Sequence, residues 1–160
     1  MLSYDVIEHG KPLQARIRET PRPQGSEVLV RIVRSGVCHS DLHIWEGYFD
    51  LGGGKRFHVK DRGCVPPFTT GHEPFGVVEA LGPDARGVAV GDRVVVHTDG
   101  GEYGSLGSGA DEGGLTDALL VRGATGRLYR VPPDMPLATA ALAEPLGVGM
   151  QAVNQADVSP

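Results

Sequence analysis

Cysteine is scarce in this sequence: the 160 residues include only two, too few for a disulfide framework. No apolar run reaches about 18 residues, so no membrane-spanning helix is expected. The opening residues, MLSYDVIEHGK, contain neither the basic nor the apolar region of a secretory signal. Basic residues form no block and the net charge is −5, which argues against nucleic acid or a membrane surface as a partner. These absences predict a cytoplasmic protein with reduced thiols.

Glycine, by contrast, is abundant. The chain has 24 glycines, about twice the usual share, and 12 prolines, with strongly apolar runs between the glycines. Short apolar runs bounded by turn residues are typical of an all-β domain. Strands are predicted over residues 2–7, 13–18, 27–37, 75–80, 92–97, 115–122 and 127–132.

A short helix is predicted directly after the strand at residues 27–37. In HSDLHIWEG, residues 39–47, the apolar side chains lie three apart, which is the spacing of a helix. Ser40 or Asp41 is a candidate N-cap, and Gly47 is expected to end the helix.

Two loops and a helical tail complete the expected organisation. Residues 48–70 are predicted to be irregular, and a loop of this length is usually functional or mobile. Residues 98–114 contain seven glycines and are predicted to form a flexible loop. Residues 137–156 are rich in helix formers, and Pro145 is expected to break or kink that helix.

The segment GVCHSDLH, residues 36–43, is the strongest indication of chemistry, because it gathers five reactive side chains in six positions. Cys38 in this segment and the distant His72 form a candidate metal pair, since thiolate and imidazole are preferred ligands of Zn²⁺. Each lies at the end of a predicted strand beside a glycine. Asp41 is a candidate to orient a ligating imidazole through its second nitrogen. The alternative interpretation is an inert buried cysteine and a surface histidine.

Two carboxylates offer further oxygen ligands. Glu73 directly follows His72, and Glu144 is the single charge in the apolar stretch ALAEPLGVGM. A charge in an apolar helix needs a partner, which favours a functional role for Glu144. The alternative is that Glu144 lies on a helix surface and is solvated.

Four segments in order, GVCHSDLH, GHEPFGVV, GDRVVV and ALAEPLGVGMQAV, resemble the zinc-dependent medium-chain alcohol dehydrogenases. The likeness is to the N-terminal, GroES-like catalytic domain of that family and runs over nearly the whole chain. Its most specific part is the GHE turn together with the upstream CxSD. The resemblance implies a mainly β, GroES-like barrel with a few short helices over residues 1–136. A helical segment over residues 137–160 would then lead toward a Rossmann cofactor domain.

The resemblance also implies one catalytic zinc site. Cys38 and His72 would be zinc ligands, and either Glu73 or Glu144 would contribute a carboxylate directly, through water or transiently. Glu144 stands where many members have a second cysteine, and this version resembles the polyol and sugar dehydrogenase branch. A carboxylate in place of a thiolate keeps the charge and hardens the site.

Three further roles follow from the same resemblance. Ser40 would hydrogen-bond the substrate hydroxyl, His43 would end a proton relay, and His39 would contact the pyrophosphate of the cofactor. His39 and His43 are four residues apart and so share one face of a helix. From the residues alone, Ser40 can equally cap the helix, and His43 can be an exposed helical side chain.

Several features depart from the family pattern. Many members hold a structural zinc with four closely spaced cysteines; this chain has none of them near residues 98–114, so no structural zinc is expected. The insertion at residues 48–70 is longer than in many members, and its Cys64 is interpreted as a plain thiol. GSLGSG and GGGKR do not fit nucleotide-binding motifs, so NAD or NADP is expected to bind only the full-length enzyme.

The sequence is therefore predicted to be the N-terminal catalytic portion of a zinc-dependent alcohol or polyol dehydrogenase, inactive without its cofactor domain. Its substrate would be a small alcohol or polyol, and the full-length enzyme is expected to be a homo-oligomer. The 160-residue chain itself is expected to self-associate through its helical tail, or to have that tail disordered. The alternative function is a stand-alone GroES-like domain that binds a metal or a partner without catalysis. A zinc-free, quinone-reductase-like relative is a third hypothesis, against which Cys38 and His72 argue.

Overall fold

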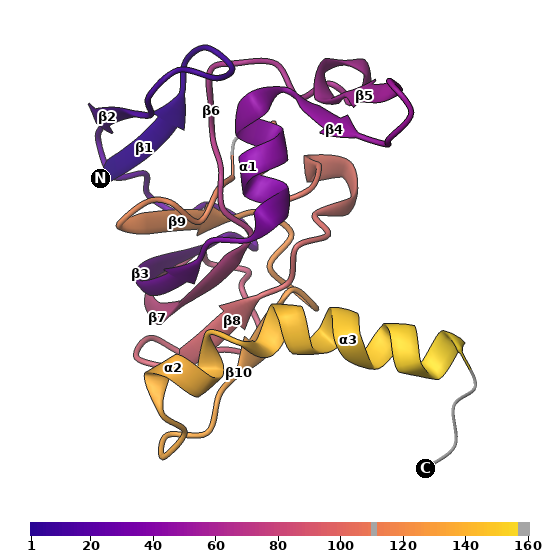
Figure 1. Ribbon diagram of the computed structural model, residues 1–160. Helices are drawn as coiled ribbons and strands as arrows, with labels where there is room; N and C mark the ends of the chain where they lie inside the picture. The colour runs from indigo at the N-terminus through magenta and orange to yellow at the C-terminus, as the bar shows by residue number, and fades with distance from the viewer. Residues whose placement is uncertain (110–111, 157–160) are drawn as a thin grey trace.

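The computed structural model describes residues 1–109 and 112–156 of the chain. It is mainly β with three short α-helices, as predicted (Figure 1). All seven predicted strands are present, with ends shifted by at most three residues. They are β1 (Leu2–Val6), β2 (Gln14–Ile17), β3 (Val28–Gly36), β7 (Glu73–Leu81), β8 (Arg93–Val96), β9 (Ala118–Val121) and β10 (Leu128–Arg130).

The strands form antiparallel sheets. The largest has the order β10-β8-β7-β3-β9, and a smaller sheet has the order β2-β1-β6, where β6 is Phe68–Thr69. The two sheets are joined where the backbone of β1 bonds to residues 115–117, including a bridge between Ser3 and Thr116. This junction connects the two sheets along one side of the predicted barrel.

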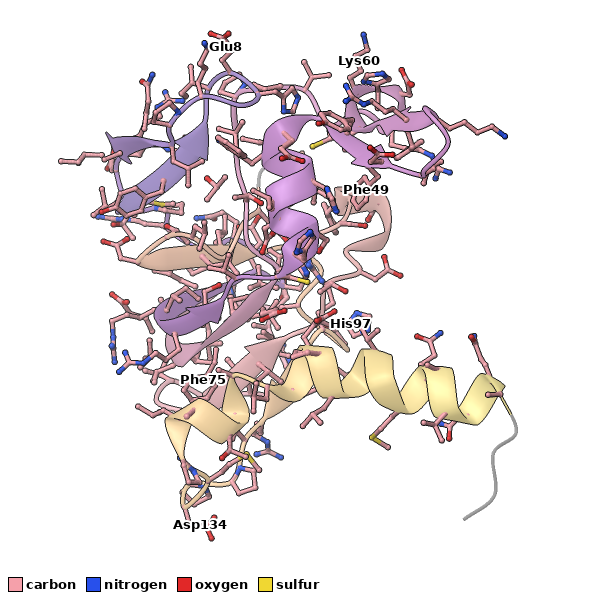
Figure 2. All side chains as sticks on the ribbon, viewed as in Figure 1. Glu8, Phe49, Lys60, Phe75, His97 and Asp134 are labelled. Carbon is pink, nitrogen blue, oxygen red and sulfur yellow. The ribbon has the colours of Figure 1, made fainter. Side chains whose placement is uncertain are left out.

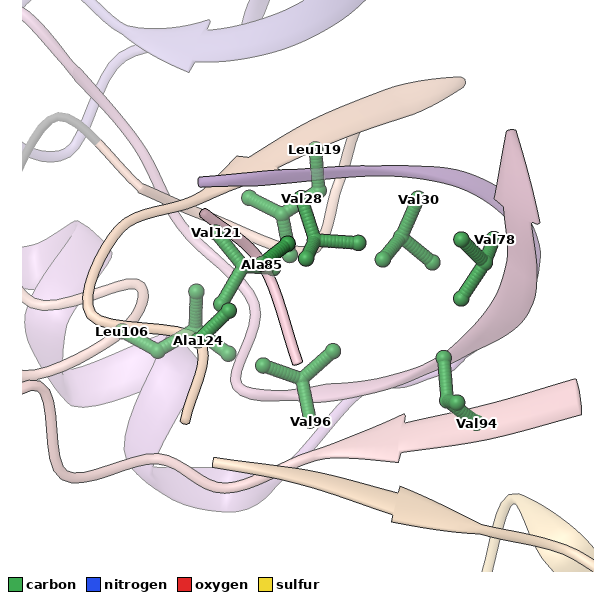
Figure 3. Close-up of a cluster of buried hydrophobic side chains, with 10 residues drawn as sticks. All are labelled: Val28, Val30, Val78, Ala85, Val94, Val96, Leu106, Leu119, Val121 and Ala124. Atoms are coloured by element: carbon green, nitrogen blue, oxygen red, sulfur yellow. The ribbon is translucent and has the colours of Figure 1, made fainter. Parts of the chain in front are cut away.

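The main core lies inside the curve of the five-stranded sheet (Figure 3). Along β8, the buried Val94 and Val96 alternate with half-buried residues, and Val28 and Val30 of β3 are likewise two positions apart, so each pair points to one face of the sheet. Fully burying each valine or leucine contributes about 1.5–3 kcal/mol of transfer free energy. The buried side chains are Val28, Val30, Val78, Ala85, Val94, Val96, Leu106, Leu119, Val121 and Ala124.

Helix α1 (His39–Glu46) follows β3 as the sequence predicted, and Gly47 ends it in the left-handed conformation with φ +89°. At the N-terminus of this helix the capping side chain is Asp41 rather than Ser40. The Asp41 carboxylate accepts a hydrogen bond of 2.9 Å from the backbone N–H of Cys38, the N-cap residue. A second apolar cluster holds the helix against β1 and β6. Its buried members are Val6, Ile44, Val59, Cys64 and Phe68.

The prediction that residues 48–70 are irregular is wrong. Strands β4 (Tyr48–Asp50) and β5 (Arg56–His58) form a hairpin, and a 3₁₀ helix, η1 (Val59–Arg62), follows before β6. Gly52, Gly53 and Gly54 all have positive φ and make the hairpin turn. Strands of three residues are too short to show a period-two pattern, which is why the sequence did not indicate them.

The glycine-rich residues 98–109 and 112–114 are anchored at several points, in contrast to the predicted flexible loop. They contain a short 3₁₀ helix, η2 (Gly101–Tyr103), and Leu106 lies in the main core. Glu112 is buried and pairs with the guanidinium of Arg127 at 2.9 Å. Residues 110 and 111 of the predicted loop lie outside the described residues.

The tail forms α2 (Leu137–Ala140) and α3 (Ala143–Gln155). The break precedes Pro145, which is the third residue of α3 and needs no intrahelical N–H partner there. Helix α3 has no buried residue and extends from the sheet (Figure 1). Self-association of this tail, and its role as a connection to a second domain, stay predictions; residues 157–160 lie outside the described part. Among the described helices, none is long and apolar enough to cross a bilayer.

Candidate metal centre

The candidate ligands meet because of the register between β3 and β7. These strands are antiparallel neighbours, and Gly36, the last residue of β3, pairs with Glu73, the first residue of β7. Cys38 lies two residues beyond Gly36, and His72 directly precedes Glu73. The register therefore places the two candidate ligands at the same end of the sheet, where α1 begins.

Three donor atoms lie together at this point. The sulfur of Cys38, a ring nitrogen of His72 and a carboxylate oxygen of Glu73 are all within 4.8 Å of one another. The Glu73 side chain occupies the space where a β-carbon on residue 36 would lie. Gly36 is thus required for the carboxylate to reach the cluster.

Asp41 connects the helix to the histidine. Its side chain is only 4% exposed and accepts four hydrogen bonds, from the backbone N–H of Cys38 and Gly71, the hydroxyl of Thr70 and Nδ1 of His72. The bond to Nδ1 is 2.9 Å long. This contact is the one proposed from the sequence, and it leaves Nε2 of the imidazole available for a ligand.

The cluster shifts the protonation of its own members. The hydrogen bond to Asp41 raises the pKa of His72 to about 9. Hydrogen bonds from Ser40 lower the pKa of the Cys38 thiol, and burial raises the pKa of Glu73. Burial alone would raise the pKa of Asp41, but hydrogen bonds from His72 and Cys38 outweigh it and lower that pKa. A cation bound at Cys38 and His72 would replace the protons that these ligand atoms otherwise carry.

The other predicted residues lie around this cluster. The hydroxyl of Ser40 is 3.3 Å from Nε2 of His72. His39 and His43 lie on one face of α1 with ring centres 4.8 Å apart, as their spacing predicted. Glu144 does not reach the three-residue cluster but borders, with Glu73, a cavity of about 470 Å³.

Some residues of this cavity were not singled out by the sequence. The cavity lies between the sheet and α3, and its polar lining includes His97, Thr98, Tyr129 and Gln151. Figure 2 shows His97 between the sheet and α3. The signal that could have found it is its place directly after the strand-like run RVVV, at the end of β8.

Cys64 is not one of the candidate metal ligands but a buried thiol in the second apolar cluster. It is 3% exposed, belongs to the second apolar cluster, and burial raises its pKa to about 11. This agrees with its interpretation as a plain thiol.

The two thiols should therefore react very differently. In the metal-free chain at pH 8, iodoacetamide is expected to alkylate Cys38 at least about tenfold faster than Cys64, because the thiolate is the reactive form. Mass spectrometry of the digested protein measures both rates. Cys64→Ser should leave the fast reaction in place and Cys38→Ser should abolish it; equal rates for the two thiols would contradict the assignment.

The donor set fits a divalent metal. Thiolate, imidazole and carboxylate are the three side-chain ligand types of Zn²⁺, with bonds of about 2.0–2.3 Å, and donors around one such ion lie about 3–4 Å apart. The cluster needs only small side-chain movements to reach that spacing. The buried Asp41 behind the imidazole is the outer partner that a metal-bound histidine requires.

Comparison with known proteins shows the family of this domain. Residues 24–136 match the model of the alcohol dehydrogenase GroES-like domain. The chain belongs to this family. An NAD-dependent alcohol dehydrogenase from Sulfurisphaera tokodaii is 41% identical over 102 residues, covering 64% of this chain and 28% of that protein. "Probable D-xylulose reductase A" from Neosartorya fischeri is 31% identical over 166 residues, covering 92% of this chain and 43% of that protein.

Solved structures show the same GroES-like architecture. Galactitol-1-phosphate dehydrogenase from Escherichia coli superposes with a TM-score of 0.77 at 25% identity, over 98% of this chain and 45% of that one. The GroES-like chain thus spans less than half the length of these relatives, and only 28% of the S. tokodaii enzyme.

Proposed function

We propose that this chain is the N-terminal catalytic portion of a zinc-dependent dehydrogenase that oxidises a small alcohol or polyol and passes hydride to NAD or NADP. The observation that carries the proposal is the cluster of Cys38, His72 and Glu73, with Asp41 bonded to the far nitrogen of the histidine. A buried inert cysteine with an unrelated histidine would not show this arrangement.

Cys38 and His72 would hold the zinc, and Glu73 is the better placed of the two carboxylates because it already lies in the cluster. Glu144 borders the adjoining cavity and would approach as an alternative ligand. A zinc ion bound there supplies Lewis-acid chemistry, lowering the pKa of a substrate alcohol and so favouring loss of hydride to a nicotinamide.

The neighbouring polar groups support the remaining roles. Ser40, whose hydroxyl touches Nε2 of His72, would accept the hydroxyl proton of the substrate. His43, one turn further along α1 and 27% exposed, would carry that proton toward solvent. His39 is exposed beside it and would contact a phosphate of the cofactor.

Polyols are the favoured substrate class. The 470 Å³ cavity next to Glu73 presents the hydrogen-bonding side chains of His97, Thr98, Tyr129 and Gln151, which suit a substrate with several hydroxyls. Two of the relatives carry names that refer to a pentulose reductase and a hexitol-phosphate dehydrogenase. We further infer that cofactor binding needs a second domain and that the full-length enzyme is a homo-oligomer.

Paramagnetic relaxation tests the site without requiring turnover. With Co²⁺ in place of zinc, the chain should shorten the proton relaxation times of xylitol, and the effect should disappear in Cys38→Ser. Propane, which has no hydroxyl, serves as the control solute. Equal effects from wild type and Cys38→Ser would contradict a polyol site at this metal.

An activity measurement tests whether the chain alone transfers hydride. The zinc-loaded 160-residue chain, mixed with NAD⁺ or NADP⁺ and xylitol, is expected to form no reduced cofactor. Turnover that depends on Cys38 would contradict the need for a second domain while supporting dehydrogenase chemistry. Failure of the chain to bind zinc would instead support the hypothesis of a zinc-free, quinone-reductase-like relative.

Replacing Asp41 tests the partner behind the histidine. Asp41→Asn keeps the size of the side chain but removes the charge that holds Nδ1 of His72, so zinc affinity is expected to fall by about 10–100-fold. Competition with a fluorescent chelator measures the affinity. Thr70→Val, which removes another hydrogen bond to Asp41, is the control and should change the affinity much less. Unchanged zinc binding in Asp41→Asn would contradict the role of this contact.

A further inference from the structure

A second cavity lies toward the other end of α1 from the candidate metal ligands. It has a volume of about 630 Å³ and is enclosed by the end of α1, the β4–β5 hairpin with η1, and the glycine-rich segment (Figure 1). Ile44, which lines it, is six residues beyond Cys38, or about 9 Å along a helix that rises 1.5 Å per residue. No lining residue is shared with the cavity beside α3. A ligand bound here would therefore occupy a separate place.

The hairpin gives this cavity an aromatic wall. Phe49 of β4 and Phe57 of β5 are directly opposite each other in the antiparallel register, so their rings lie on the same face of the hairpin. Both rings line the cavity, with centres 6.2 Å apart and planes inclined by 45°, and Figure 2 labels Phe49. The buried Val59 and Cys64 add apolar surface. An aromatic group bound here would be removed from water and would pack against rings.

Arg62, the last residue of η1, brings a positive charge to this wall. It is exposed, and its guanidinium carbon lies 5.6 Å from the centre of the Phe57 ring. Within the part of the chain that the structure describes, Arg62 makes no ion pair and no hydrogen bond. A guanidinium can hold a carboxylate through two parallel hydrogen bonds. The cation is thus beside the rings and lacks an anionic partner.

The glycine-rich segment adds polar groups to the lining. The hydroxyl of Ser108 donates to the backbone carbonyl of Ser105 at 2.9 Å, whereas the hydroxyl of Ser105 has no partner among the described residues. Glu102 is the other charged residue of the lining. Its carboxylate accepts a hydrogen bond from the hydroxyl of Tyr103, which raises the pKa of that tyrosine. Removing the charge of Glu102 should therefore favour a bound anion, and removing the charge of Arg62 should disfavour one.

We propose that this cavity binds a small aromatic carboxylate, with its ring against Phe49 and Phe57 and its carboxylate on Arg62. The volume falls within the range of about 300–1,000 Å³ that is usual for small-molecule sites. The ring supplies apolar contact, and the paired charges supply orientation. The proposal does not depend on the dehydrogenase function, because the cavity includes none of the candidate metal ligands.

Calorimetric titration of the metal-free chain with 2-naphthoate tests the proposal. Wild type is expected to bind one molecule per chain, and Arg62→Gln should weaken the binding by about tenfold. Glu102→Gln should strengthen it, since it removes a like charge. Lys60→Gln is the matched control, because Lys60 belongs to the same 3₁₀ helix and carries the same charge but does not line the cavity. 2-Naphthamide, which has the same rings without the charge, should bind wild type and Arg62→Gln equally.

Three results would overturn the proposal. The first is that wild type binds no 2-naphthoate. The second is that Lys60→Gln weakens the binding as much as Arg62→Gln does, which would show a general attraction of anions to a basic surface. The third is that Cys38→Ser abolishes the binding while Phe57→Leu leaves it unchanged, which would place the carboxylate at the cysteine centre. Circular dichroism of each variant verifies that the fold is intact.

Discussion

Cys38→Ser is expected to abolish stable zinc binding while leaving the fold in place. A serine hydroxyl stays protonated near neutral pH, whereas the Cys38 thiol already has a lowered pKa and is prepared to bind as thiolate. The loss of affinity should exceed the roughly 10–100-fold typical of an outer partner such as Asp41. Elemental analysis after dialysis against a chelator measures it as zinc atoms per chain.

The matched control is Cys64→Ser. Both cysteines are described, but Cys64 lies in the apolar cluster beneath α1 and belongs to no group of candidate ligands. Cys64→Ser should therefore keep its zinc, although burying a hydroxyl there will lower the stability of the fold. Equal zinc in Cys38→Ser and wild type would show that the metal, if any, is held elsewhere.

Glu112→Gln is expected to destabilise the fold by about 3–5 kcal/mol, because it leaves a buried cation without its partner. The side chains of Glu112 and Arg127 are 2% and 7% exposed, and their closest oxygen and nitrogen are 2.9 Å apart. Glu112 also accepts the backbone N–H of Arg122. These contacts fix the end of the glycine-rich segment against the connection between β9 and β10. Urea unfolding followed by circular dichroism gives the change in free energy.

A double variant separates the buried charge from the loss of contacts. Replacing both partners, as Glu112→Leu with Arg127→Met, removes the unpaired charge and should recover much of the stability lost in Glu112→Gln. If Glu112→Gln unfolds at the same urea concentration as wild type, the ion pair does not hold this segment. If the double variant is as unstable as the single one, hydrogen bonds to the backbone are the main contribution.

The sequence allowed much of this site to be predicted, because its ligands are adjacent to strand ends. Cys38 and His72 stand beside glycines where β3 ends and β7 begins, and antiparallel pairing of those strands brings them together. Asp41 was identified by its residue type, and the structure places its carboxylate on Nδ1 of His72.

The parts that sequence reasoning missed depend on contacts between distant segments. Strands β4 and β5 have three residues each and no alternation of apolar and polar side chains, so the sequence predicts an irregular segment there. Leu106 and Glu112 are single buried residues among glycines, and nothing local marks them as anchors. His97 and Gln151 line one cavity only because α3 lies beside β8, a position that no period within either segment specifies.

The central claim is that Cys38 and His72 bind one divalent ion together, and the absorption spectrum of the Co²⁺-loaded chain tests it most directly. We predict a near-ultraviolet charge-transfer band from thiolate to cobalt, together with the intense visible bands of a tetrahedral site. Both should be present in Cys64→Ser, and the charge-transfer band should vanish in Cys38→Ser. A cobalt spectrum without that band, or one that loses it only in Cys64→Ser, would contradict the account.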